Sequence, residues 1–178
     1  VGFHNVAVGE NSLELNTTGD QNVAIGVTAL RANTTANNNT AIGFSSLKCN
    51  TTGIQNTSVG ACSLFANTTA NDNTAVGYQA LQDNTTGVRN VALGKNALAN
   101  NTTADNSQAI GYNALVNNTT GCQNVALGSS ALQANTTGDN NISIGISSLY
   151  SNTEGDDNVA IGCASLINNT TADGNTAV

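Results

Sequence analysis

Residues that could carry out chemistry are few and scattered in this chain. Its 178 residues include one histidine, His4, and no methionine. No nucleophile recurs beside His4, so the pairing of a base with a serine or cysteine that activates a nucleophile is not indicated. Glycines occur in turn-like contexts and never as a phosphate loop leading into a helix. We therefore expect no catalytic residues, no cofactor and no enzymatic activity.

Acidic residues are the only candidates for metal ligands. Seven of the eleven acidic residues fall within short polar segments: Asp20, Asp72, Asp105, Asp139, Asp156, Asp157 and Asp173. Asp139, Asp156 and Asp157 form the one grouping that could hold a cation, although the nine-residue pattern of a calcium-binding β-roll is absent. The alternative, which we favour, is a solvated turn that keeps the protein soluble. The net charge of −7 argues against a nucleic-acid partner, because phosphate contacts need Lys and Arg.

The acidic residues belong to a short sequence repeat that has no insertion or deletion. A glycine preceded by an aliphatic residue recurs every 17 residues from Gly9 to Gly162, as the interval from Gly9 to Gly26 shows (26 − 9 = 17). Ten full units span residues 5–174, with the consensus N-[VT]-A-[VI]-G-x-x-[AS]-L-x-x-N-T-T-[GA]-x-x. Residues 1–4 and 175–178 are partial repeats that continue the array. We number the positions of the unit as columns 1 to 17, starting from its first Asn.

The repeat predicts an all-β fold, because a unit this short cannot accommodate the helix pair of the two-helix repeats. The segment N-V-A-I-G alternates with a period of two and is typical of a strand. A second short extended stretch is expected around Ala-Leu, and N-T-T-G supplies a turn. Each unit then forms one coil of a parallel β-solenoid, or β-roll. Ten coils stacked about 4.8 Å apart make a rod roughly 48 Å long.

Stacking turns each column into a ladder of equivalent side chains. We expect the leucine column (Leu13, Leu81, Leu166) to face the Val/Ile column and to form a thin core. The asparagines of column 12 (Asn16, Asn84, Asn169) should stack amide on amide at the inside of a turn. A core this thin is marginal, and further surface must therefore be buried. We assign this to close packing of chains along a small-residue stripe, represented by Ala7, Ala24, Ala75, Ala92 and Ala126.

Aromatic and modifiable residues give weaker indications. The variable columns 6 and 10 collect Phe44, Phe65, Tyr78, Tyr112 and Tyr150, which are either a recognition surface for saccharide or protein or neutral variation at exposed positions. The nine Asn-Thr-Thr triplets are formal glycosylation acceptors, but a ladder is the favoured interpretation at this spacing. The four cysteines are expected to be free thiols, because none has a partner within bridging distance.

The motifs N-V-A-I-G, N-T-A-V-G, A-L and N-T-T-G resemble the repeats of bacteriophage and giant-virus tail fibres and of related bacterial surface proteins. They are also similar to the shorter N-S-V-A-I-G repeat of trimeric autotransporter adhesin heads. The resemblance covers the whole chain. It implies a left-handed, trimeric β-roll in a fibre or adhesin, located on a cell surface, a virion or an extracellular filament.

A structural and adhesive fibre module is therefore the expected function. The partners would be the chain itself, as a homotrimer or larger fibre and in end-to-end filaments, together with a glycan or protein receptor. No membrane insertion is expected, because no apolar stretch approaches the length of a span. The alternative is an ice- or surface-binding solenoid that uses its Thr ladders. Both ends are expected to be covered in the native object, since neither carries an atypical capping unit.

Overall fold

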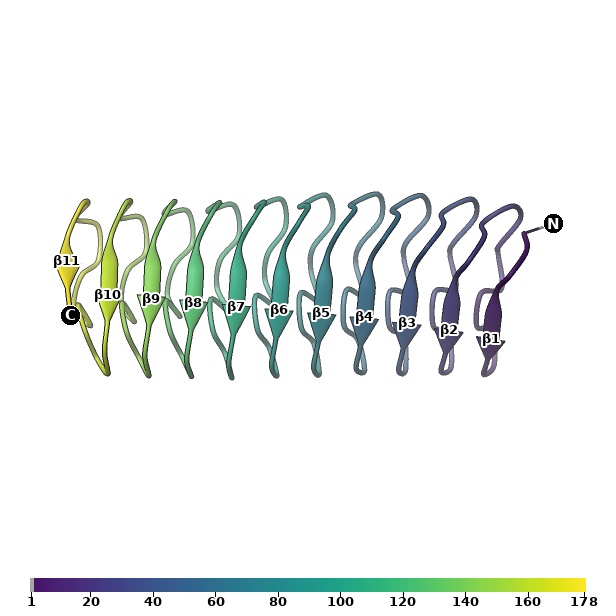
Figure 1. Ribbon diagram of the computed structural model, residues 1–178, viewed down its shortest axis with the longest axis horizontal. Coiled ribbons are helices and arrows are strands. Elements are labelled where there is room, and N and C mark those ends of the chain that lie inside the picture. Colours follow the sequence, from purple (N-terminus) through teal and green to yellow (C-terminus); the bar gives the residue numbers. More distant parts are fainter. Residues whose placement is uncertain (1) are drawn as a thin grey trace.

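Each repeat unit forms one coil, and the coils stack in chain order along a rod (Figure 1). The computed structural model describes residues 2–178. One sheet of eleven parallel strands runs the length of the rod in the order β1 to β11. The predicted all-β parallel solenoid is thereby confirmed. The strands are β1 (Val6–Val8), β2 (Val23–Ile25), β3 (Thr40–Ile42), β4 (Thr57–Val59), β5 (Thr74–Val76), β6 (Val91–Leu93), β7 (Gln108–Ile110), β8 (Val125–Leu127), β9 (Ile142–Ile144), β10 (Val159–Ile161) and β11 (Thr176–Ala177).

The register of the sheet equals the repeat length throughout. In the β5–β6 pair, for example, Thr74 lies beside Val91 and Ala75 beside Ala92. Because every strand pair keeps this offset of one repeat unit, each column of the sequence becomes a straight row along the rod. The two termini consequently lie at opposite ends of the rod in Figure 1.

A glycine follows every complete strand because adjacent coils touch there. Gly77, after β5, has a φ of 138°, a conformation that side chains of L-residues rarely adopt. A Cβ built on Gly77 would lie 2.5 Å from the carbonyl oxygen of Gly94 in the next coil. The column 5 glycine thus allows adjacent coils of one chain to pack closely.

The second half of the coil is a turn, so the predicted second extended stretch is wrong. Three columns have left-handed backbone conformation in every full coil, as at Gln79 (φ 55°), Leu81 (φ 52°) and Arg89 (φ 57°). These residues curl the chain around the leucine instead of extending it. Hydrogen bonds between coils continue outside the strands, since the Leu81 amide donates to the Ala97 carbonyl at 3.0 Å.

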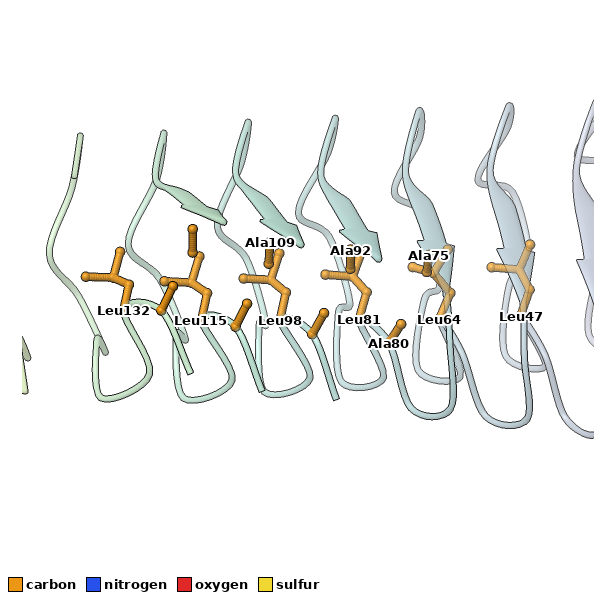
Figure 2. Close-up of a cluster of buried hydrophobic side chains, with 14 of the residues drawn as sticks. Leu47, Leu64, Ala75, Ala80, Leu81, Ala92, Leu98, Ala109, Leu115 and Leu132 are labelled. Carbon is orange, nitrogen blue, oxygen red and sulfur yellow. The ribbon is translucent and has the colours of Figure 1, made fainter. Parts of the chain in front are cut away.

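The core contains one leucine and two small residues per coil. Leu81, Ala80 of column 8 and Ala75 of column 3 are fully buried. Figure 2 shows the leucine row lying between the alanines of the strands and those of the turns. In coils that carry Ser in column 3, such as Ser58, the column 8 residue is also Ser, and the Ser58 and Ser63 hydroxyls lie 2.6 Å apart.

Two predictions about which side chains point into the coil are wrong. The Val/Ile column does not face the leucines but lies on the outside of the coil, where Ile25 and Val76 are 37% and 38% exposed. The small-residue stripe expected to join subunits lies inside one chain: Ala24, Ala75, Ala92 and Ala126 are at most 1% exposed. Ala7 alone of that set is exposed, in the first coil. One leucine nearly fills so narrow a coil, which leaves room for no more than an Ala or Ser side chain on the inner side of the strand.

Candidate functional site

Two asparagine columns hold the turns together. The Asn84 side-chain Nδ2 donates to the Asn67 Oδ1 at 3.0 Å and to the Gly87 carbonyl at 2.9 Å. Asn73, from column 1, donates its Nδ2 to the same carbonyl at 2.9 Å. The column 12 ladder extends to the ends of the array, where Asn33 donates to Asn16 and Asn169 donates to Asn152.

This hydrogen-bond network bears on whether the asparagines of the Asn-Thr-Thr triplets can be glycosylated. Both Nδ2 hydrogens of Asn84 are used in hydrogen bonds, and its side chain is completely buried. An enzyme that attaches a glycan must reach this nitrogen. In the interior coils it is inaccessible, and the triplets there act as turn-forming ladders, whereas Asn16 and Asn169 at the two ends are half-buried.

The two threonine columns of the triplet have different environments. In column 13, the Thr85 Oγ1 donates to the Thr102 carbonyl of the next coil at 3.0 Å, and Thr85 is half-buried. In column 14, Thr86 is exposed. The hydroxyls of column 13 therefore donate hydrogen bonds to the next coil. Columns 13 and 14 together do not supply the flat face of free hydroxyls that the ice-binding alternative uses.

Asp139 and Asp156 of the acidic grouping with Asp157 are engaged in hydrogen bonds between coils. The Asp139 Oδ1 accepts a hydrogen bond from the Cys122 amide at 2.6 Å, and the Asp156 Oδ1 accepts one from the Asp139 amide at 2.7 Å. Within residues 2–178, no group of three or more His, Cys, Asp or Glu side chains is arranged to hold a metal ion. The Asp139 and Asp156 carboxylates satisfy backbone N–H groups of the preceding coil.

Column 16 alternates between an apolar residue or Cys and Asn or Asp over coils 3 to 8. The Ile54 amide donates to the Asn71 Oδ1 at 2.7 Å, and the Val88 amide donates to the Asp105 Oδ1 at 2.7 Å. Here Asn or Asp in one coil caps the backbone of the coil before it. Column 15 alternates as well, with T-T-G followed by T-T-A over the first seven units, and a consensus of single units averages both alternations out.

The aromatic residues expected to form one recognition surface fall into two rows. Phe44, Tyr78 and Tyr112 belong to column 6 and are exposed. The Lys95 Nζ lies between the two tyrosines, 5.9 Å from the Tyr78 ring centroid and 5.8 Å from that of Tyr112. Each distance is within the range of a cation–π interaction. Three consecutive coils therefore present one aromatic and cationic cluster.

The remaining two aromatics lie in column 10. The Lys48 Nζ is 5.3 Å from the Phe65 ring centroid. The Tyr150 hydroxyl accepts a hydrogen bond from the Gln133 Nε2 at 3.3 Å. Each of these contacts joins two adjacent coils, and neither includes a member of the column 6 cluster.

A larger surface, missed in the sequence, is what we call the outer face: columns 2, 4 and 6 of the ten full coils. Column 4 is Val, Ile or Leu in every coil, although many of these side chains are exposed. Glu10 and Lys95 are the only charged residues of this face. Its exposed large apolar and aromatic side chains are Val6, Val8, Ile25, Val27, Ile42, Phe44, Val76, Tyr78, Ile110, Tyr112, Leu127, Ile142, Ile146 and Ile161.

Residues 2–178 contain no disulfide. All four cysteines are free thiols, as predicted. The described chain contains no pocket. Nor does this part of the chain contain a helix long and apolar enough to cross a membrane.

Comparisons with protein-family models, with curated proteins and with solved structures gave no match to this chain.

Proposed function

We propose that the chain is a non-catalytic structural and adhesive module of a fibre, such as the shaft or head of a viral tail fibre or of a cell-surface adhesin. The observation that carries this proposal is the uninterrupted parallel sheet of eleven strands that runs along the rod. The repeat motifs that resemble tail-fibre and adhesin-head repeats support the same function.

The way the side chains are used supports a load-bearing role. The columns with least variation, Asn of column 12 and Leu of column 9, make contacts within and between coils. Thr85 and its equivalents add a further row of hydrogen bonds between coils. Stacked polar ladders of this kind resist separation of successive coils. A rod held in this way can space or present a binding tip without chemistry of its own.

The proposal extends to partners and location. The chain associates with copies of itself, as a homotrimer by resemblance, in an extracellular filament or on the surface of a cell or virion. The column 10 aromatics, the half-buried Phe65 and the exposed Tyr150, lie off the outer face and are the surface we assign to a glycan or protein receptor, because aromatic side chains contribute strongly to such contacts.

Immunoelectron microscopy of the native source tests the proposal. Antibodies raised against the folded solenoid should label filaments at the surface of the cell or virion that makes the protein. Labelling confined to the cell interior, with no filament, would contradict it. Clear thermal hysteresis of the purified protein at micromolar concentration would instead support the ice-binding alternative.

A further inference from the structure

We infer that the outer face is the surface through which copies of this chain pack side by side, parallel and with equivalent coils at the same height. This inference rests on the proposed fibre function and names the contact that builds the fibre. The occupant of the face is a second copy of the chain.

The length of the outer face is the first support. Ten coils at about 4.8 Å and the two strand columns, about 6.6 Å apart, give a strip of roughly 48 by 10 Å, or about 480 Å², and column 6 adds to it beyond the strand end. The largest apolar patch on a soluble monomer is about 300–600 Å². The outer face thus reaches the upper part of that range and runs the whole length of the rod, as a contact between parallel rods requires.

The distribution of side chains across the face is the second support. Column 4, in the middle, is aliphatic in all ten coils. The flanking columns mix apolar residues with Thr40, Thr74, Gln108 and Ser129. Protein interfaces have this arrangement, with an apolar centre surrounded by a more polar rim. An exposed strand position with no partner has no physical reason to remain aliphatic in every coil, since Thr would suit the strand equally well.

Charge is the third support, and it favours a copy over a basic or acidic partner. The face carries one negative and one positive residue, Glu10 and Lys95, although the chain has a net charge of −7. Most acidic residues lie instead in the turn columns 16 and 17, as Asp139 and Asp157 do. Two copies can therefore meet through their outer faces without burying like charges against each other.

Periodicity identifies the register. Every coil of the chain has the same length, so only a partner with the same rise keeps its side chains in step along the whole rod. A second copy meets this condition. In a fibre with one direction, rotation about an axis along the rod brings column 4 of each copy to the same height. Ile110 of one copy then lies beside Ile110 of the next.

Complementary charges at one coil test this contact. Full-length chains with Ile110→Asp or Ile110→Lys are compared with Thr120→Asp and Thr120→Lys, which change an exposed column 14 residue of the same coil. Sedimentation should show self-association weakened at least tenfold for each Ile110 variant and unchanged for the Thr120 variants. Mixing the Asp and Lys forms at Ile110 should restore part of the assembly, because a mixed trimer has two Asp–Lys contacts and one contact between like charges. Ile110 variants that associate like the wild type would overturn the inference.

A second mixture tests the register. Ile42→Lys lies four coils from Ile110→Asp, a separation of about 19 Å along the rod. This mixture should not restore assembly, and rescue equal to that of the matched pair would rule out packing with equivalent coils at one height. If the charged variants unfold, the double variant Val76→Thr with Ile110→Thr keeps β-branched side chains in both strands. Its association should still weaken, and unchanged association would overturn the inference.

The wild-type chain separates failure of this inference from failure of the proposed function. A folded wild-type monomer would remove self-assembly altogether, and the fibre function with it. A wild-type assembly that tolerates charge at Ile110 would leave the fibre proposal standing and show that the copies meet through another surface.

Discussion

At the level of single residues, size decides which side chains enter the coil. Leu81 occupies the interior, and Ala75 and Ala80 close the space around it. Larger aliphatic residues such as Val76 are left on the outside of the strand. Fully buried polar residues such as Asn84 are hydrogen-bonded, whereas the buried Oδ1 of the half-buried Asn96 has no partner within residues 2–178.

The first prediction concerns the interior alanines. Ala92→Leu adds three heavy atoms to a site with no exposed surface, and overpacking of this kind costs about 1–3 kcal/mol. The same change at Thr103, an exposed column 14 residue of that coil, should alter the free energy of unfolding by less than about 0.5 kcal/mol. Urea unfolding of both variants measures the difference. Similar midpoints would mean that the alanine column is not in the core.

The second prediction concerns the buried amides. Asn84→Asp removes both donors of the Nδ2 group and places a carboxylate among the acceptors Asn67 Oδ1 and Gly87 O. Loss of buried hydrogen bonds should cost at least about 1–3 kcal/mol. Asn100→Asp makes the same chemical change at an exposed position whose one side-chain bond, to Asn117, is 3.3 Å long. Thermal unfolding should show a clear loss for Asn84→Asp only, and equal losses would contradict the ladder's role.

At the level of elements, one strand and one curled turn make the whole coil. The strand ends at a glycine because the next coil approaches too closely for a side chain, as Gly94 does at Gly77. The turn then places residues such as Leu81 in the left-handed region, which is uncommon for an ordinary side chain. Packing of the leucine in the core offsets this local strain.

The third prediction separates two glycines of column 5. Gly77→Ala puts a methyl group 2.5 Å from the Gly94 carbonyl oxygen at a φ of 138°, so it should destabilise the chain by about 2–4 kcal/mol. Gly162→Ala should cost less, because Gly162 has a similar φ of 121° but no heavy atom lies within 4 Å of a Cβ built there. Chemical denaturation of the two variants provides the test. An equal or greater loss at Gly162 would contradict this account of the strand end.

The sequence was sufficient to predict the number, length and register of the coils, because the glycine and leucine columns recur without interruption. It did not determine which side of the strand faces inward. Ala75 and Val76 are both apolar, and only the narrow width of the folded coil shows that the smaller one must be inside. The turn at Leu81 was also unpredictable, since leucine has no preference for a left-handed backbone. The outer face was missed because the sequence did not show which side of the strand faces inward.

At the level of the whole molecule, stability grows along one dimension. Each coil contacts only its neighbours, so the free energy of unfolding is a sum over coils and the contacts between them. A core of one leucine and two small residues per coil contributes little to that sum. The outer face is an apolar surface that runs along all ten coils, and its burial between copies would stabilise all of them at once.

Sedimentation equilibrium of the wild-type chain at micromolar concentration tests this account most directly. The outer face predicts a folded assembly whose mass is a multiple of 17.9 kDa, three copies by resemblance to the adhesin heads. Far-UV circular dichroism of the same sample should show β-structure and no helix. A folded species of 17.9 kDa that stays monomeric as concentration rises would contradict the account.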